Sequence, residues 1–178
     1  IKNLKEVSLV KKLFLAILGT ILLAISAKIK IPFWPVPMTM QTFVVLLLGV
    51  LYGWKLGLFT VSLYLIEGIA GLPVFAGTPE KGIGLMYFTG TTMGYLIGFL
   101  VAVFLMGFFT FSNNFLKNFL KVVFSVSFIY LLGLLWLGSI IGWDKPVFKL
   151  GAQPFLLAEL FKVLILTILI PKILRFRS

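Results

Sequence analysis

The chain alternates between long apolar segments and short connectors that are rich in proline and lysine. Six segments are predicted to cross a membrane, where a helix needs about 20 apolar residues and shorter helices occur inside a bundle. None has the two-residue alternation of a lipid-facing barrel strand, so each is predicted to be a helix. The six predicted helices cover residues 9–27, 38–52, 56–70, 83–111, 116–141 and 155–170.

The last apolar segment carries two opposite charges, Glu159 and Lys162, one helical turn apart. An ion that faces lipid costs roughly 2.5 to 3.5 kcal/mol on insertion scales, so both side chains are expected to face the protein interior. There they can neutralise each other and tie the bundle together, bind a polar ligand, or do both. In the ligand interpretation, Lys162 holds an anionic group and Glu159 accepts from N–H donors.

Two connectors are unusually apolar for exposed loops. Residues 31–37 read Ile-Pro-Phe-Trp-Pro-Val-Pro, and three prolines in this stretch cannot continue a helix. Residues 71–82 hold turn-forming residues throughout. An even number of predicted helices separates the two connectors, so both emerge on the same side of the membrane. We expect them to be lids over a cavity or ordinary interfacial anchors.

Composition supports the membrane assignment. The 178 residues are 61% hydrophobic, with a mean hydropathy of +1.15, as in an all-α polytopic membrane protein with a single domain over residues 1–178. The formal net charge of +11 comes from basic residues at the ends of apolar segments, which favours membrane orientation over nucleic-acid binding. With the N-terminus inside, ten basic residues lie on the cytoplasmic side and five outside, so both termini are predicted to be cytoplasmic.

The chain lacks the side chains that most enzymes and metal sites use. It has no cysteine, no histidine and five carboxylates, none of which the sequence pairs for general acid–base work. Gly77 and Gly82 have the spacing of a phosphate-binding loop, but Ile83 stands where lysine is required. We therefore expect no enzyme activity, no cofactor and no metal, and any ATP must be hydrolysed by another chain.

Polar and aromatic residues near the two connectors and the charged pair form a candidate binding site. A few polar groups among apolar walls suit a ligand with a polar head, an apolar middle and a carboxylate tail. For Trp34 and Trp143, an interfacial position is the competing interpretation. The candidate residues are Trp34, Thr39, Gln41, Glu67, Phe75, Thr78, Tyr87, Thr92, Tyr95, Trp143, Glu159 and Lys162.

The first predicted helix carries a stripe of small residues, Ala16, Thr20 and Ala24, at four-residue spacing. Small residues let another helix approach closely. The stripe is therefore predicted either to dock a partner membrane protein or to pack inside the bundle.

Four stretches, taken in order, resemble the BioY family, the biotin-specific substrate-binding components of energy-coupling factor (ECF) transporters. They are residues 35–42, 64–77, 90–99 and 151–162. The resemblance implies a compact bundle of six transmembrane helices in the cell membrane that binds biotin near the outer face. It also implies two kinds of partner, a transmembrane coupling protein and two ATP-binding-cassette (ABC) ATPases that drive uptake.

The resemblance further assigns roles to particular residues. Glu159 and Lys162 match ligand-contacting positions, although the family pattern Pro-Gly-Asp-Leu-x-Lys reads Leu-Ala-Glu-Leu-Phe-Lys in this chain. Gly77 and Thr78 fall in a loop that contacts the ureido ring in relatives. The implied carboxylate partner is Lys162 or another nearby cation, and the small-residue stripe is the implied docking face for the coupling protein. Aromatic residues implied to pack on the ligand ring are Trp34, Phe75 and Tyr95.

Other functions stay open at the level of sequence. An ion-coupled secondary transporter of another small carboxylated vitamin would use Glu67 or Glu159 for proton coupling. A membrane-embedded enzyme would need a turnover product from some substrate. A purely structural membrane subunit would bind no ligand.

Overall fold

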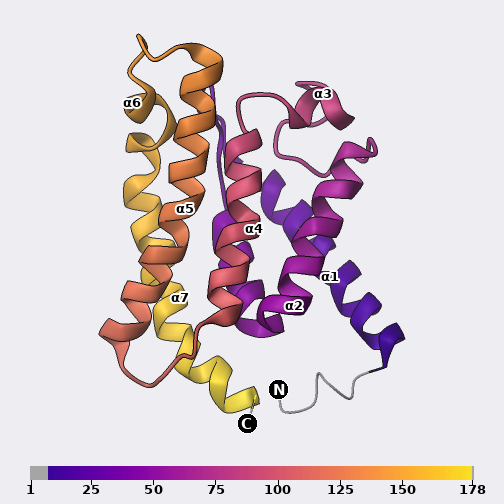
Figure 1. The fold of residues 1–178 in the computed structure, drawn as a ribbon, viewed down its shortest axis with the longest axis vertical. Coiled ribbons are helices and arrows are strands. Elements are labelled where there is room, and N and C mark those ends of the chain that lie inside the picture. The colour runs from indigo at the N-terminus through magenta and orange to yellow at the C-terminus, as the bar shows by residue number, and fades with distance from the viewer. Residues whose placement is uncertain (1–7, 178) are drawn as a thin grey trace.

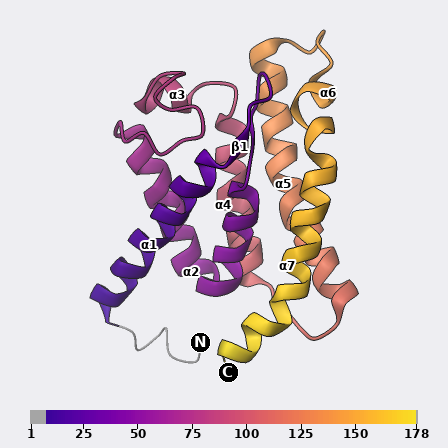
Figure 2. The same cartoon turned by 180° about the vertical axis from the view of Figure 1, so that it is seen from behind.

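The computed structural model describes residues 8–177 and is mostly helical. Its long helices run side by side, with two short helices at one end of the bundle (Figures 1 and 2). The first helix begins and the last helix ends at the opposite end of the bundle. In chain order the elements are α1 (Leu9–Lys28), β1 (Lys30–Ile31), β2 (Met38–Thr39), α2 (Gln41–Ile69), α3 (Gly84–Phe88), α4 (Met93–Phe108), α5 (Phe115–Ile141), α6 (Val147–Gly151), the 3₁₀ helix η1 (Gln153–Phe155) and α7 (Leu156–Arg177).

The proline-rich connector is the loop of a small antiparallel sheet. Strands β1 and β2 pair so that Lys30 lies opposite Thr39. The helix predicted to begin at residue 38 therefore begins at Gln41 instead, because Met38 and Thr39 belong to the strand. The sheet fixes Thr39 directly before the first turn of α2.

Helix α2 is two helices joined by a reversal at Gly53. This glycine has φ 73° and ψ 173°, a backbone conformation that residues with a side chain rarely adopt. In a straight helix Gln41 and Tyr64 would lie about 34 Å apart. Gln41 Nε2 instead donates a hydrogen bond to the Tyr64 hydroxyl at 2.7 Å. The two halves of α2 correspond to the helices predicted over residues 38–52 and 56–70.

The single helix predicted over residues 83–111 is wrong. The structure divides this segment into α3 and α4 with a turn at residues 89–92. Trp136 Nε1 of α5 donates to the Gly90 carbonyl at 2.8 Å and ties the turn to the bundle. The turn contains three threonines, whose hydroxyls compete for backbone hydrogen bonds and weaken a helix.

Four helical segments of the described chain are long and apolar enough to cross a membrane: α1, α2, α5 and the stretch from α6 to α7. Helix α4 is apolar but shorter. Because α2 is a hairpin, the described residues contain six long helical segments. The last of them continues through Pro171 to Arg177, beyond the end predicted at residue 170.

Helix α4 lies between α2 and α5 (Figure 1), and glycines let these backbones approach closely. A Cβ added to Gly98 of α4 would lie 2.6 Å from the Cα of Ile129 in α5. On the other side, a Cβ added to Gly49 of α2 would lie 2.6 Å from the Cβ of Met106. The walls of the site described below therefore stand on tightly packed helices.

We expect Gly94→Ala to destabilise the protein, because its Cβ would meet the Leu132 carbonyl oxygen at 2.3 Å. Overpacking of this kind costs about 1–3 kcal/mol, so thermal unfolding in detergent should occur several degrees lower. Gly57→Ala is the matched control, since its nearest neighbour is a side-chain methyl of Val103 at 2.9 Å. Equal unfolding temperatures for the two variants would contradict this account of the packing.

Candidate ligand-binding site

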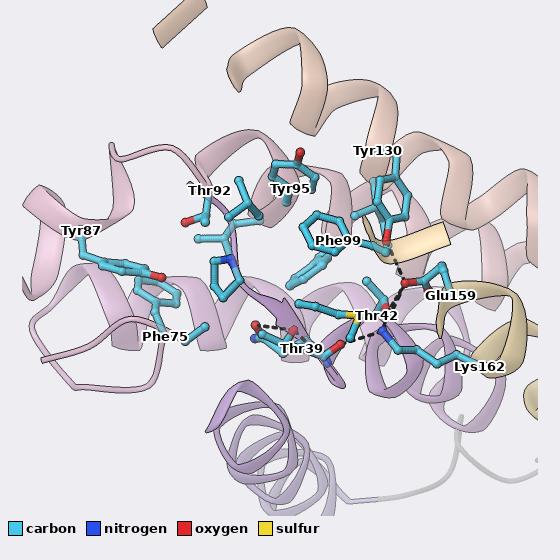
Figure 3. A pocket seen from close by; sticks show the side chains of 18 residues that line it. Thr39, Thr42, Phe75, Tyr87, Thr92, Tyr95, Phe99, Tyr130, Glu159 and Lys162 are labelled. Atoms are coloured by element: carbon cyan, nitrogen blue, oxygen red, sulfur yellow. Dashed lines mark hydrogen bonds and ion pairs between the residues drawn. The ribbon is translucent and has the colours of Figure 1, made fainter. Parts of the chain in front are cut away.

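A cavity opens among the first turns of α2, α4 and α7, the middle of α5 and the loop that follows α2 (Figure 3). Its empty volume, including its open mouth, is about 560 Å³. Small-molecule sites are hollows lined mainly by apolar and aromatic side chains with a few polar groups, and this cavity has such a lining. Glu159 and Lys162 lie at one end of the cavity, and Phe75 and Tyr87 lie at the other.

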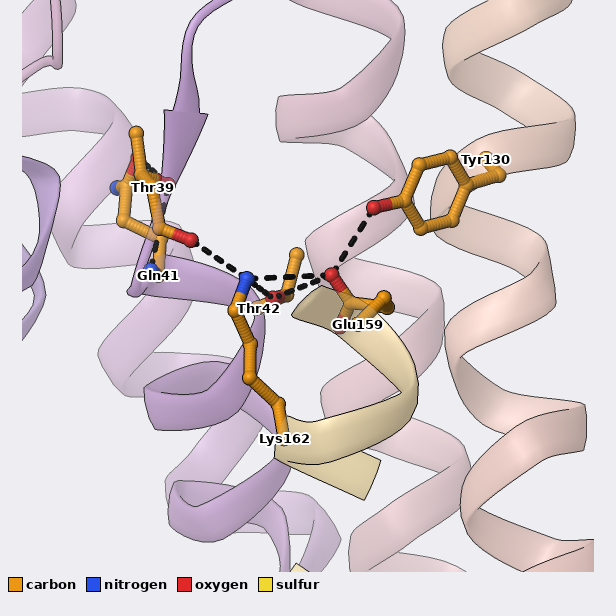
Figure 4. A network of polar contacts seen from close by, with 6 residues as sticks. All are labelled: Thr39, Gln41, Thr42, Tyr130, Glu159 and Lys162. Atoms are coloured by element: carbon orange, nitrogen blue, oxygen red, sulfur yellow. Dashed lines mark hydrogen bonds and ion pairs between the residues drawn. The ribbon is translucent and has the colours of Figure 1, made fainter. Parts of the chain in front are cut away.

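The charged end of the cavity is a compact hydrogen-bond network (Figure 4). Lys162 Nζ donates to the Thr39 carbonyl at 2.7 Å, to Thr42 Oγ1 at 3.0 Å and to Glu159 Oε2 at 3.2 Å. Glu159 Oε2 also accepts from Thr42 Oγ1 at 3.1 Å and from the Tyr130 hydroxyl at 2.9 Å. The network therefore joins α7 to α2, α5 and β2.

Local structure explains why these groups meet. Glu159 and Lys162 are three residues apart, so they share one face of α7. Glu159 lies in the first turn of α7, where the positive end of the helix dipole favours a carboxylate. Thr39 is presented by the sheet, and Thr42 lies in the first turn of α2.

The network leaves one acceptor unsatisfied. An ammonium group has three N–H donors, and all three of Lys162 have a partner. Glu159 Oε1, by contrast, is buried without a hydrogen-bond partner among residues 8–177. A buried polar atom without a partner is costly and points to a ligand or water that completes it. The charged end of the cavity can therefore accept an N–H or O–H donor from a ligand.

The rest of the cavity is mainly apolar and aromatic. Phe75 is fully buried, with its ring stacked on Tyr87 at a centroid distance of 5.4 Å. The Tyr95 hydroxyl donates to the Gly151 carbonyl at 2.8 Å, which leaves the ring as the part that faces the cavity (Figure 3). Phe99 and Phe155 add further apolar surface. These walls suit a ligand with an apolar middle.

Eight of the thirteen candidate ligand residues line the cavity, and five do not: Trp34, Glu67, Gly77, Thr78 and Trp143. Trp34 is 76% exposed on the proline-rich loop, as expected for the interfacial interpretation. Gly77 and Thr78 are engaged within the protein: the Gly77 N–H donates to the Tyr87 hydroxyl at 2.9 Å, and the Thr78 carbonyl accepts a hydrogen bond from Lys28 Nζ. That the other eight bind a ligand stays a prediction. They are Thr39, Gln41, Phe75, Tyr87, Thr92, Tyr95, Glu159 and Lys162.

Sequence reasoning missed two partners of Glu159. Tyr130 lies in the middle of α5, and Thr42 ends the first stretch that resembles the BioY family, a resemblance that assigns no role to this residue. A phenol hydroxyl inside a long apolar helix needs a hydrogen-bond partner. This requirement could have indicated Tyr130 as a candidate polar residue of the site. No sequence pattern indicates that α5 brings this hydroxyl to α7.

The small-residue stripe of α1 packs inside the chain. Ala16 and Thr20 are buried, and a Cβ added to the neighbouring Gly19 would lie 2.5 Å from a methyl of Thr60 in α2. Ala24 is half-buried against the same core. This geometry matches the alternative interpretation, internal packing, and docking of a partner on the stripe stays an untested prediction.

A mostly helical chain with several membrane-length helices and a cavity of this kind is a membrane protein built to hold a small ligand. The chain belongs to the BioY family, whose family model matches residues 2–178. This is a family of transporter S-components rather than enzymes.

Individual relatives agree with this assignment. The chain is 36% identical over 158 residues to the probable biotin transporter BioY of Pyrococcus horikoshii, covering 89% of each chain. It is 32% identical over 156 residues to the biotin transporter BioY of Thermotoga maritima, covering 87% of this chain and 90% of that one. Its fold is similar, with a TM-score of 0.77 and 28% identity, to the crystal structure of the S-component for biotin from an ECF-type ABC transporter. That match covers 93% of this chain and 92% of the other.

We expect Lys162→Met alone to destabilise the protein more than Lys162→Met combined with Glu159→Gln. The single change leaves a buried carboxylate uncompensated, which costs about 3–5 kcal/mol, whereas the double change leaves two neutral groups. Thermal unfolding in detergent measures the difference, and the exposed Lys149→Met is the control for loss of a lysine. A double variant no more stable than Lys162→Met would show that the pair does not depend on mutual neutralisation.

Proposed function

We propose that this chain is a biotin-binding S-component that takes up biotin as part of an ECF-type transporter. The observation that carries the proposal is the unsatisfied Glu159 Oε1 at the end of an apolar-walled cavity. The named relatives are biotin transporters, and the similar crystal structure is an S-component for biotin. Biotin has the three parts that such a cavity suits: a ureido head with N–H donors, an apolar middle and a carboxylate tail.

The hydrogen bonds favour one orientation of biotin. A ureido N–H donates to Glu159 Oε1, the buried acceptor without a partner among the described residues. The carboxylate lies away from Lys162, because the three donors of Lys162 are already engaged and an anion would have to displace them. The apolar middle packs against Phe75, Tyr95 and Phe99.

A second hollow receives the carboxylate tail. Its empty volume is about 340 Å³, and it shares Pro37, Tyr87 and Thr92 with the wall of the main cavity. Lys81 is the cation in its lining, and across residues 8–177 the Lys81 ammonium has no hydrogen-bond or ion-pair partner. Lys81 is thus the nearby cation for the tail, in place of Lys162.

We further propose that the chain lies in the cell membrane. The six long helical segments cross the membrane, both termini are cytoplasmic, and the cavity opens on the outer side. This orientation is supported by the excess of basic residues near the start of α1 and the end of α7. The partners are a transmembrane coupling protein and two ABC ATPases, which supply the ATP hydrolysis that this chain has no motif for.

We expect Glu159→Gln to weaken biotin binding by more than about tenfold, since loss of a buried charged contact costs about 2 kcal/mol or more. Equilibrium binding to the purified protein gives the two Kd values. Glu67→Gln is the matched control, because Glu67 lies outside the cavity lining and is also partly buried. Unchanged affinity in Glu159→Gln would remove the site assignment while leaving the fold and family in place.

We expect Lys81→Met to weaken binding of biotin several-fold but to leave binding of biotin amide unchanged. The amide carries no charge, so it gains nothing from the Lys81 ammonium, whereas the carboxylate loses an ionic contact in a half-open site. Competition binding with both ligands on wild type and variant measures the effect. An equal loss for both ligands, or none for either, would place the tail elsewhere.

A further inference from the structure

Residues 75–78, the 75–78 wall, cover the cavity with their first two residues, and two lysines from a distant part of the chain hold this segment. Phe75 and Ala76 line the cavity and are buried. Lys28 Nζ donates to the Phe75 carbonyl at 2.9 Å, and Lys30 Nζ donates to the Ala76 carbonyl at 2.6 Å. The 75–78 wall is thus fastened by its backbone to the end of α1 and to β1.

All three N–H donors of the Lys28 ammonium have a partner in this wall. Besides the Phe75 carbonyl, its ammonium reaches the Thr78 carbonyl at 2.6 Å and Thr78 Oγ1 at 3.3 Å. Hydrogen bonds from an ammonium are roughly twice as strong as neutral ones. A lysine whose only role is to anchor the end of a membrane helix at the interface directs its ammonium to water or lipid headgroups. These bonds instead satisfy buried carbonyls of a loop that has no regular secondary structure.

Further contacts of the 75–78 wall join it to α2 and α3. The Phe75 ring meets Tyr64 of α2 edge-on at 5.5 Å and stacks on Tyr87 of α3. The Gly77 N–H also bonds to Tyr87. The two lysines are therefore the polar link between the 75–78 wall and the segment that comprises α1 and β1.

Helix α1 is itself attached on one side only. It packs on α2 through the face that includes Ala16 and Leu23, while Ile17, Ile21 and Ile25 are exposed. In a membrane these exposed residues face lipid or a partner protein. The lysine contacts thus connect a one-sided helix to the wall that covers the ligand.

We propose that Lys28 and Lys30 are positioning residues for the ligand cavity. They hold the backbone of residues 75–78 so that Phe75 and Ala76 close over the bound ligand, and neither lysine lines the cavity. Their role in binding rests on the proposed function, because it assumes that the ligand in this cavity is biotin. Loss of the lysine contacts opens the wall while the helical bundle stays folded.

Opening of the 75–78 wall can be measured without any ligand by labelling an introduced thiol, because the sequence has no cysteine of its own. Ala76→Cys introduces a single thiol at a position that is 6% exposed, and its labelling rate by a maleimide reports opening of the wall. We expect Lys28→Met combined with Lys30→Met to raise this rate by about tenfold or more, from the loss of several charge-assisted bonds. Arginine at both positions should restore slow labelling, because guanidinium groups also donate to carbonyls.

Two controls separate wall opening from general loosening. Ala102→Cys lies in the α4 core and is fully buried, so its labelling should not change when the lysines are replaced. Lys55→Met removes an exposed lysine that makes no contact with the wall, and labelling at position 76 should again stay slow. Unchanged labelling at position 76 in the double methionine variant would overturn the proposal. An equal increase at positions 76 and 102 would also overturn it.

Ligand kinetics then test the consequence for binding. We expect the double methionine variant to release biotin about tenfold faster or more, with a smaller change in the association rate, because the wall acts after the ligand has entered. Unchanged dissociation together with faster labelling would show that the wall does not hold the ligand. If the wild-type protein bound no biotin, the proposed function would fail, while the labelling result would still decide whether the lysines hold the wall.

Discussion

The Glu159–Lys162 ion pair is the interaction on which the site depends. Both side chains are more than nine-tenths buried, and a buried pair offsets its desolvation only if further hydrogen bonds satisfy the remaining groups. The Thr39 carbonyl, the Thr42 hydroxyl and the Tyr130 hydroxyl supply those bonds. They come from β2, α2 and α5, so the charges are satisfied only when these elements and α7 have assembled. The cost of burying the ions thus makes the site and the fold interdependent.

In the proposed function the same network gives the site its selectivity. A binding site with an unsatisfied acceptor discriminates strongly against a ligand that lacks the matching donor, because the buried acceptor then stays without a partner. Glu159 Oε1 provides that acceptor, while Lys162 is held in place by bonds within the protein. In the proposed function Lys162 therefore acts by holding the Glu159 carboxylate in position. In the proposed orientation the anionic tail is read by Lys81, at the opposite end of the ligand.

Much of this architecture could be predicted from the sequence, and the parts that could not share a cause. Apolar length and breakers revealed the long helical segments, including both halves of α2, because hydropathy depends on local composition. The inward position of Glu159 and Lys162 followed from the cost of exposing ions to lipid, and the structure buries both. Tyr130 and Thr42 were missed because their roles arise from helices that meet only in the fold. Trp34 lies outside the cavity lining, and the sequence does not distinguish an aromatic residue near a site from one at a membrane interface.

Two sides of the cavity are held in different ways, and this difference determines on which side a ligand could leave. The side formed by α4 and α5 is packed through glycines at backbone distance, and it adjoins the ion network on α7. The side formed by residues 75–78 is apolar toward the cavity and is held to α1 and β1 by Lys28 and Lys30. Movement of this apolar wall separates no buried ions, because Glu159 and Lys162 keep all their partners on β2, α2 and α5. Opening on the Phe75 side therefore avoids the cost of uncovering an unpaired charge, whereas opening on the α7 side would incur it.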